Sequence, residues 1–200
     1  MVIPIISLLF SALASTANKQ TNRTMEHNMK AKKTLVAFFS RAGENYAVGN
    51  IAEGNTRIIA DMIVDETGGD IFQITPETPY PEDYAQCTEV AKRELAAKAR
   101  PAIKGDAAVE DYDTIFLGYP NWWGDMPMPV YTFIEKHCWQ GKTVMPFCTH
   151  EGSGLSGTEH KLETACQGAA LLKGIALKGA TAQNERARAK ESKNEWLSKL

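Results

Sequence analysis

Residues 34–39 read TLVAFF, a continuous apolar run with lysines before it and Ser40-Arg41 after it. An apolar run without polar alternation is typical of a β-strand that is covered on both faces. Strands of this kind belong to parallel sheets, in which helices pack on both sides. The run therefore predicts an α/β fold and marks its first strand.

The chain after residue 39 alternates between helical and strand-like patterns. The segment 56–67 places Ile59, Met62 and Ile63 at helical spacing, and Gly68 follows its end. Parallel strands joined by helices require right-handed crossovers, and strands that are apolar at every position need helices on both faces of the sheet. We therefore predict a three-layer, doubly wound open sheet of five parallel strands. The predicted helices are 56–67, 81–99, 128–137 and 184–200, and the further strands are 70–75, 114–119, 143–149 and one within 169–180.

Composition and charge exclude several classes of protein. A length of 200 residues fits one domain, and 44% apolar with 23% charged residues exclude a collagen-like or wholly disordered chain. The formal net charge is -2, but residues 1–33 hold five basic residues against one acid, so residues 34–200 carry -6. Nucleic acids are bound mainly by clustered Lys and Arg, so we predict no nucleic-acid binding.

The amino-terminal segment has the pattern of an export signal. Residues 2–14 are apolar and end in small residues, which predicts a signal peptide over 1–17 and a polar linker over 18–33 before a domain at 34–200. The apolar stretch is shorter than the ~20 residues that cross a bilayer as a helix, so no stable membrane span is expected. A cleaved signal implies a periplasmic protein, and an uncleaved one a cytoplasmic protein.

The loop after the first strand has features of a phosphate site. Ligands of doubly wound sheets bind outside the carboxyl ends of the strands, where this loop, residues 40–56, begins. It ends in Gly54, Asn55 and Thr56 at the start of a predicted helix, where free amides and the helix dipole suit a phosphate. An ordinary helix N-cap is the alternative interpretation.

Two further loops should reach the same edge. Residues 120–127 contain Trp122 and Trp123, which have no obvious apolar face to pack on and could stack on a planar aromatic ligand. Residues 150–157 are rich in glycine and offer backbone amides that could bind the polar edge of such a ring. Together the three loops predict one site for a flat, phosphorylated ligand.

The set of loops resembles the flavodoxin-like FMN-binding family, in the branch whose phosphate loop is interrupted. A compact flavodoxin would read roughly S-x-x-G-N-T, whereas this chain has Ser40-Arg41-Ala42, an insertion of about eleven residues, and then Gly54-Asn55-Thr56. The similarity covers about residues 33–198. It implies the strand order 2-1-3-4-5 and FMN as the cofactor.

The resemblance also implies which residues would contact FMN, and it assigns no catalytic residue and no metal ligand. Asn121 departs from the apolar residue expected before the tryptophan pair. The phosphate would be held by Ser40, Arg41, Ala42, Asn55 and Thr56. One side of the isoalloxazine would be lined by Pro120, Asn121, Trp122, Trp123 and Gly124, and the other rim by Thr149, Glu151, Gly152, Ser153 and Gly154.

Other motifs compete with this interpretation. Residues 152–157 match the dinucleotide pattern G-x-G-x-x-G, but four predicted strands precede them and no acid ends the next strand. Cys148, His150 and His160 lack a fourth ligand at zinc spacing. Ser153 does not stand in a G-x-S-x-G nucleophile elbow.

Cysteine usage does not decide the compartment. The four cysteines could pair in three ways, but none are spaced as C-x-x-C, and free buried thiols are favoured. They are Cys87, Cys138, Cys148 and Cys166.

Two functions fit the predicted site. The favoured one is an electron-transfer carrier that uses the bound flavin and docks to redox partner proteins or a small electron donor or acceptor. The alternative is an FMN-dependent NAD(P)H or quinone-type oxidoreductase, with its substrate under the inserted loop near Tyr46. A flavin-free partner-binding domain is a more distant alternative. The oligomeric state is left open.

Overall fold

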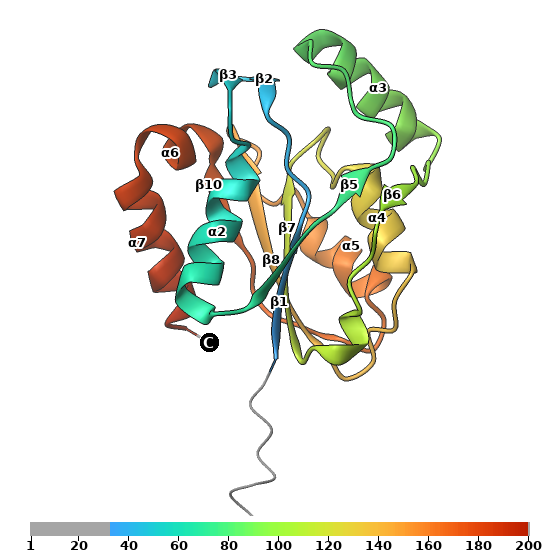
Figure 1. The fold of residues 1–200 in the computed structure, drawn as a ribbon, viewed down its shortest axis with the longest axis vertical. Coiled ribbons are helices and arrows are strands. Elements are labelled where there is room, and N and C mark those ends of the chain that lie inside the picture. The colour runs from blue at the N-terminus through green and yellow to red at the C-terminus, as the bar shows by residue number, and fades with distance from the viewer. Residues whose placement is uncertain (1–32, 200) are drawn as a thin grey trace, which may run out of the picture. The chain divides into compact units, whose positions relative to one another are not determined.

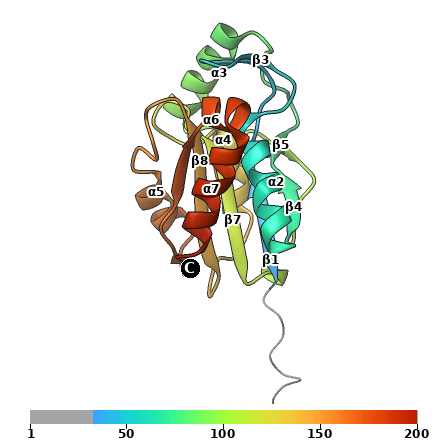
Figure 2. The same cartoon turned by 90° about the vertical axis from the view of Figure 1, so that its left-hand side faces the viewer.

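The computed structural model describes residues 33–199, shown in two views in Figures 1 and 2. They belong to one compact unit that begins at Lys33. The predicted signal peptide (1–17) and linker (18–33) lie outside the described residues, apart from Lys33. Within residues 33–199, no helix has both the length and the apolarity needed to cross a bilayer.

The central sheet is parallel and has the strand order β10-β8-β7-β1-β4. This order confirms the predicted 2-1-3-4-5 arrangement. The fifth position is shared by two short strands, because β9 pairs with the start of β8 and β10 with its end. The strands are β1 (Thr34–Phe38), β4 (Asp70–Gln73), β7 (Thr114–Pro120), β8 (Thr143–His150), β9 (Ala170–Leu171) and β10 (Ile175–Lys178).

Helices cover both faces of the sheet (Figure 1). One face carries α2 (Asn55–Thr67), α6 (Gly179–Asn184) and α7 (Arg186–Leu197), which contact one another. The other carries α3 (Tyr84–Ala96), α4 (Met128–Glu135) and α5 (Thr158–Ala165), and α4 contacts both of the others. Short elements complete the fold: the hairpin β2 (Gly43–Asn45) and β3 (Gly49–Ile51), the pair β5 (Thr75–Pro76) and β6 (Ile103–Lys104), and a 3-10 turn at Val109–Asp111.

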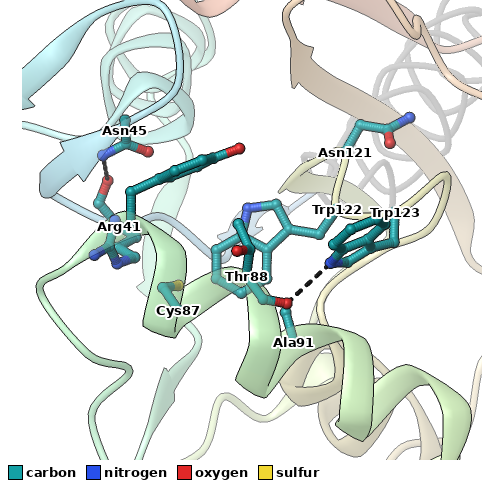
Figure 3. Close-up of a pocket in the computed structure, with 9 residues that line it drawn as sticks. Arg41, Asn45, Cys87, Thr88, Ala91, Asn121, Trp122 and Trp123 are labelled. Carbon is teal, nitrogen blue, oxygen red and sulfur yellow. Dashed lines mark hydrogen bonds between the residues drawn. The ribbon is translucent and has the colours of Figure 1, made fainter.

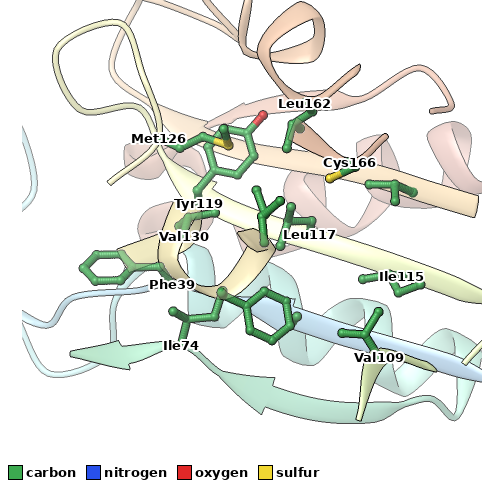
Figure 4. Close-up of a cluster of buried hydrophobic side chains, with 14 of the residues drawn as sticks. Phe39, Ile74, Val109, Ile115, Leu117, Tyr119, Met126, Val130, Leu162 and Cys166 are labelled. Atoms are coloured by element: carbon green, nitrogen blue, oxygen red, sulfur yellow. The ribbon is translucent and has the colours of Figure 1, made fainter. Parts of the chain in front are cut away.

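The apolar run in β1 supplies both cores of the domain. Leu35 and Ala37 are buried in the cluster on the α4 and α5 face, part of which Figure 4 shows. Val36 and Phe38 are buried in the cluster under α2 and α7. Because successive strand residues point to opposite faces, a strand between two helix layers must be apolar at every position.

The second predicted helix has different ends in the structure. It was expected over 81–99 but forms only Tyr84–Ala96. Asp83 is its N-cap, and its carboxylate accepts the Gln86 N–H at 2.7 Å. A capping carboxylate lies before the first helical turn, so the acids at 82 and 83 precede the helix.

The carboxyl-terminal third is also divided differently. The strand predicted within 169–180 is interrupted near Gly174, where a Cβ would lie 2.8 Å from the Pro146 carbonyl oxygen. The helix predicted over 184–200 is two helices that are separated at Glu185, whose φ and ψ of -132° and 50° are not helical. The inserted loop, for which no structure was predicted, contains the β2–β3 hairpin.

Candidate functional site

A hollow of about 280 Å³ lies where the carboxyl ends of the central strands meet the loops that follow them. We call it the edge pocket. Its lining combines several predicted site residues with others from the inserted hairpin, α3 and the end of β8. The predicted ones are Asn55, Pro120, Asn121, Trp122, Thr149, Glu151, Gly152 and Ser153, and the others are Asn45, Tyr46, Tyr84 and His150.

The start of α2 forms one end of the edge pocket and has free backbone donors. Gly54 is its N-cap and provides no side chain, and its first turn has no acidic residue. Ser40 Oγ accepts the Arg57 N–H at 3.0 Å. Among the described residues, the Asn55 and Thr56 N–H groups have no acceptor. A helix start with free amides and no nearby acid in its own turn suits an anion.

Hydroxyl and amide groups join α2 to β8 and α6. Thr56 and Thr149 are buried and share a hydrogen bond of 2.7 Å between their hydroxyl oxygens. The side-chain amide oxygen of Asn55 accepts a hydrogen bond from the Gln183 side-chain amide at 2.9 Å. Glu151 accepts the Ala180 N–H at 2.7 Å, so its carboxylate is turned toward the start of α6.

Arg41 links two segments that we call the cover of the site, the inserted hairpin and the loop before α3. Its side chain does not point to the start of α2. Its guanidinium donates to the backbone carbonyls of Glu44, Pro81 and Glu82. These bonds connect the inserted hairpin to the loop before α3. As a consequence, Tyr84 at the start of α3 stacks on Tyr46 of the hairpin, with ring centroids 6.1 Å apart.

The two predicted tryptophans have different environments. Trp122 is half-buried and packs edge-on against Phe39 and Tyr80, with centroids 5.3 and 5.0 Å away. Trp123 has a φ of 58°, is 52% exposed, and donates its indole N–H to the Thr88 carbonyl at 3.1 Å. Only Trp122 lines the edge pocket, whereas both line a second hollow beside it.

Asn121 holds the two loops of the site together. Its amide nitrogen donates to the Gly154 carbonyl and to Ser156 Oγ, both at 2.9 Å. Its amide oxygen accepts the Gly124 N–H at 3.0 Å. A polar residue therefore stands where an apolar one was expected because it bridges the loops after β7 and β8.

The remaining predicted residues lie around the edge pocket without lining it. Ser40 and Thr56 contact the start of α2 and β8, and Arg41 and Trp123 line the second hollow. Gly124 and Gly154 are bonded to Asn121. Ala42 lines a separate hollow with residues such as Tyr80.

Sequence reasoning missed Asn45 and Tyr84. Asn45 lies in the hairpin, where its amide donates to the Gly43 carbonyl at 3.1 Å, and neither strand of the hairpin has an apolar pattern. Tyr84 reaches the site because Arg41 fixes the preceding loop and because the Glu44 carboxylate of the hairpin accepts the Tyr84 N–H at 2.8 Å. No local pattern indicates either residue.

All four cysteines are free in the structure. Cys87, Cys148 and Cys166 are buried, as predicted, and burial raises the pKa of each thiol. Cys138 is exposed, contrary to the prediction.

His150 makes the loop after β8 sensitive to pH. Its Nδ1 accepts the Gly152 N–H at 2.8 Å, which requires an unprotonated Nδ1. Burial lowers the pKa of His150; Lys178 lowers this pKa further and Glu151 raises it. Stability from this group is complete above the ordinary pKa of about 6.5 and is lost as the pH falls from there through the folded pKa.

We therefore expect ligand binding at the edge pocket to weaken below about pH 6.5, because protonated His150 cannot accept the Gly152 N–H. The phosphate group of a ligand itself titrates near pH 6. The pH dependence of binding must therefore be compared between the parent protein and a variant without the His150 imidazole. In His150→Asn, the amide oxygen can replace Nδ1 as the acceptor, and the extra pH dependence should disappear. Equal pH profiles for the parent and His150→Asn in equilibrium titrations would contradict this role.

Comparisons with known proteins give a consistent result. The family model for flavodoxin matches residues 33–196. An inferred flavoprotein from Bacteroides eggerthii is 31% identical, with a TM-score of 0.66 over 84% of this chain and 96% of that one. One from Bacteroides uniformis is also 31% identical, with a TM-score of 0.64 over 84% and 99%. A flavoprotein from Lactobacillus acidophilus in complex with FMN is 21% identical, with a TM-score of 0.58 over 78% and 99%. No curated protein matches the chain.

Proposed function

The chain belongs to the flavodoxin family, and from this premise we propose that it binds FMN in the edge pocket and acts as an electron-transfer carrier. One observation supports the proposal most directly. The edge pocket extends from the start of α2 at Asn55, where no side chain caps the helix, to the ring of Trp122. These two features suit the phosphate and the ring system of one ligand.

The residues at the start of α2 fit a phosphate. The free N–H groups of Asn55 and Thr56 can donate to it, and so can the Ser40 hydroxyl and one hydroxyl of the hydrogen-bonded Thr56–Thr149 pair. A hydroxyl that accepts one hydrogen bond retains a proton to donate. A Cβ at Gly54 would lie 2.2 Å from Ser40 Oγ, so the close approach of these segments requires glycine.

The other end of the edge pocket fits a planar ring. Trp122 offers an aromatic face, and the loop of Glu151, Gly152 and Ser153 offers backbone groups at the rim. Small-ligand pockets usually have volumes of about 300–1,000 Å³. The edge pocket, at about 280 Å³, lies close to the lower end of this range.

FMN supplies reversible one- and two-electron chemistry when it is bound, and the protein adjusts it. The chain holds the ligand with Trp122 and the β8 loop and covers it with Tyr46 and Tyr84. No side chain is assigned as an acid, base or nucleophile.

We propose redox partner proteins with basic surfaces as partners. Glu44, Glu82 and Asp83 are exposed at the cover of the site, and charges of one sign steer partners of the opposite sign. Asp125 does not contribute to this rim. It is only 7% exposed and is paired with Lys161 at 2.7 Å.

A specific observation favours a second function, an FMN-dependent NAD(P)H or quinone-type oxidoreductase. The second hollow shares Asn45, Tyr84, Asn121 and Trp122 with the edge pocket. A small molecule in it would be next to the flavin.

Titration of the full-length chain with FMN and with riboflavin tests the proposal. We expect FMN to bind about tenfold or more tightly than riboflavin, because charge-assisted hydrogen bonds to the phosphate each contribute about 1.5–3 kcal/mol. A colourless protein that takes up neither flavin would show a flavin-free binding domain.

Under anaerobic conditions, NAD(P)H alone should leave the flavin absorption of a carrier unchanged, whereas rapid bleaching would favour the oxidoreductase.

A further inference from the structure

The second hollow has a volume of about 200 Å³ and an aromatic lining; we call it the tryptophan pocket. Figure 3 shows Trp122 between Arg41 on one side and Trp123 on the other, with Cys87 and Ala91 of α3 along a third side. An apolar cavity of about 150 Å³ is enough to bind benzene. The tryptophan pocket therefore has room for one six-membered ring with a small substituent. Its lining is Arg41, Asn45, Tyr84, Cys87, Thr88, Ala91, Asn121, Trp122 and Trp123.

The Arg41 guanidinium and the side-chain NH2 groups of the two asparagines in this lining already have partners. Arg41 is the single formally charged residue among those that line it, and its guanidinium is used by three backbone carbonyls. The Asn121 amide is used by the loops it bridges, and the Asn45 amide by the Gly43 carbonyl. A cation would have no acid in the lining to pair with, and an anion would compete with three carbonyls for the Arg41 guanidinium, which disfavours a charged ligand.

The Thr88 hydroxyl and the Cys87 thiol lead to the same conclusion. Thr88 donates its hydroxyl to the Ala85 carbonyl at 2.8 Å. Burial raises the pKa of the Cys87 thiol, so this group is neutral at pH 7. Apart from Arg41, the pocket thus presents neutral polar groups among aromatic rings.

Trp123 is fixed in the position that forms one wall. Its φ of 58° is unfavourable for a bulky residue, and it is nevertheless held by the hydrogen bond of its indole to Thr88 and by Lys92, whose amine lies 5.3 Å from the ring centroid. Because Trp122 is held by Phe39 and Tyr80, both indoles are positioned without a ligand. Preformed aromatic walls favour stacking on another ring.

We propose that the tryptophan pocket binds an uncharged, single-ring aromatic compound. Its place beside the flavin rests on the proposed function, since the two pockets share Trp122 and Tyr84. Such a ligand would be the small redox partner of the flavin and would enter by the face that α3 borders.

Titration of the full-length, FMN-loaded, ¹⁵N-labelled protein with nitrobenzene tests the proposal. The readout is the set of indole N–H signals, which needs no turnover. We expect saturable shifts for Trp122 and Trp123, and none for Trp139 and Trp196, which are buried in the two cores. The proposal would be overturned if Trp122 and Trp123 showed no saturable shifts, or if all four tryptophans showed equal shifts.

A matched pair of variants on α3 locates the binding. Ala91 is buried and lines the tryptophan pocket but not the edge pocket, whereas Ala96 is exposed on the same helix. Ala91→Leu should fill the cavity and raise the nitrobenzene dissociation constant by about tenfold or more, with FMN affinity unchanged. Ala96→Leu should change neither.

The outcomes separate the two proposals. Loss of FMN affinity in Ala91→Leu would mean that the cavity belongs to the flavin site and would overturn the second-ligand assignment. If the parent protein takes up no FMN, the proposed function fails, and the nitrobenzene titration of the same protein still tests the cavity. Shifts that persist unchanged in Ala91→Leu would place the compound elsewhere and overturn the proposal.

Discussion

Replacing Gly118 with alanine should lower the free energy of unfolding by about 1–3 kcal/mol or more. Gly118 lies in β7 between Phe38 of β1 and Phe147 of β8, in register with both. A Cβ at this position would lie 2.1 Å from the end of the Phe147 ring. Phe147 is 1% exposed and packed in the core under α2 and α7, so its ring has no free space to move into. Overpacking of this kind is destabilising even when the added group is one methyl.

The measurement is thermal or denaturant unfolding of four proteins in a double-mutant cycle. Phe147→Leu alone should destabilise the domain by leaving a cavity. Gly118→Ala combined with Phe147→Leu should be more stable than the sum of the two effects, because the shorter side chain makes room for the methyl group. Additive effects would contradict the proposed clash.

The sheet could be predicted because its determinants are local. In β1, β7 and β8 nearly every residue is buried, so each strand is a continuous apolar run that is visible in the sequence. Once the strands are ordered, the loops after Phe38, Pro120 and His150 must lie at one edge. For this reason the sequence indicated most of the edge pocket.

The cover of the site could not be predicted because its determinants are distant. The position of α3 depends on the bonds from Arg41 to Pro81 and Glu82, which are some 40 residues away in the sequence. The same bonds explain why Arg41, which was assigned to the phosphate, has its guanidinium turned to the cover. An arginine in a loop has the same appearance in the sequence whether it binds an anion or a carbonyl.

The separation of the two tryptophans has a similar origin. Trp122 and Asp125 exchange two backbone hydrogen bonds, at 2.9 and 3.1 Å, which form a tight turn. The turn leaves Trp123 and Gly124 with positive φ angles and directs the Trp123 ring to α3. The two adjacent tryptophans therefore lie in different environments, and the sequence alone could not show this difference.

Replacing Gly54 with alanine should weaken FMN binding by about 100-fold, because the loss of one or two charge-assisted hydrogen bonds of about 1.5–3 kcal/mol each has an effect of this size. A Cβ at Gly54 would lie 2.2 Å from Ser40 Oγ and 2.6 Å from the Arg41 carbonyl oxygen. Rotation of Ser40 could relieve the first contact, but the second involves backbone and requires α2 to move. Movement of α2 would separate its free amides from Ser40 and break the hydrogen bond from Arg57.

Riboflavin distinguishes this effect from general damage, because it lacks the phosphate that the start of α2 would hold. We expect riboflavin affinity to change much less than FMN affinity in Gly54→Ala, as measured by equilibrium titration of the apoprotein. Glu53→Ala is the control at the adjacent position, since Glu53 lines neither pocket and its ion pair with Arg186 is partly exposed. Equal losses for both flavins would place the phosphate elsewhere, and unchanged FMN binding in Gly54→Ala would remove the start of α2 from the site.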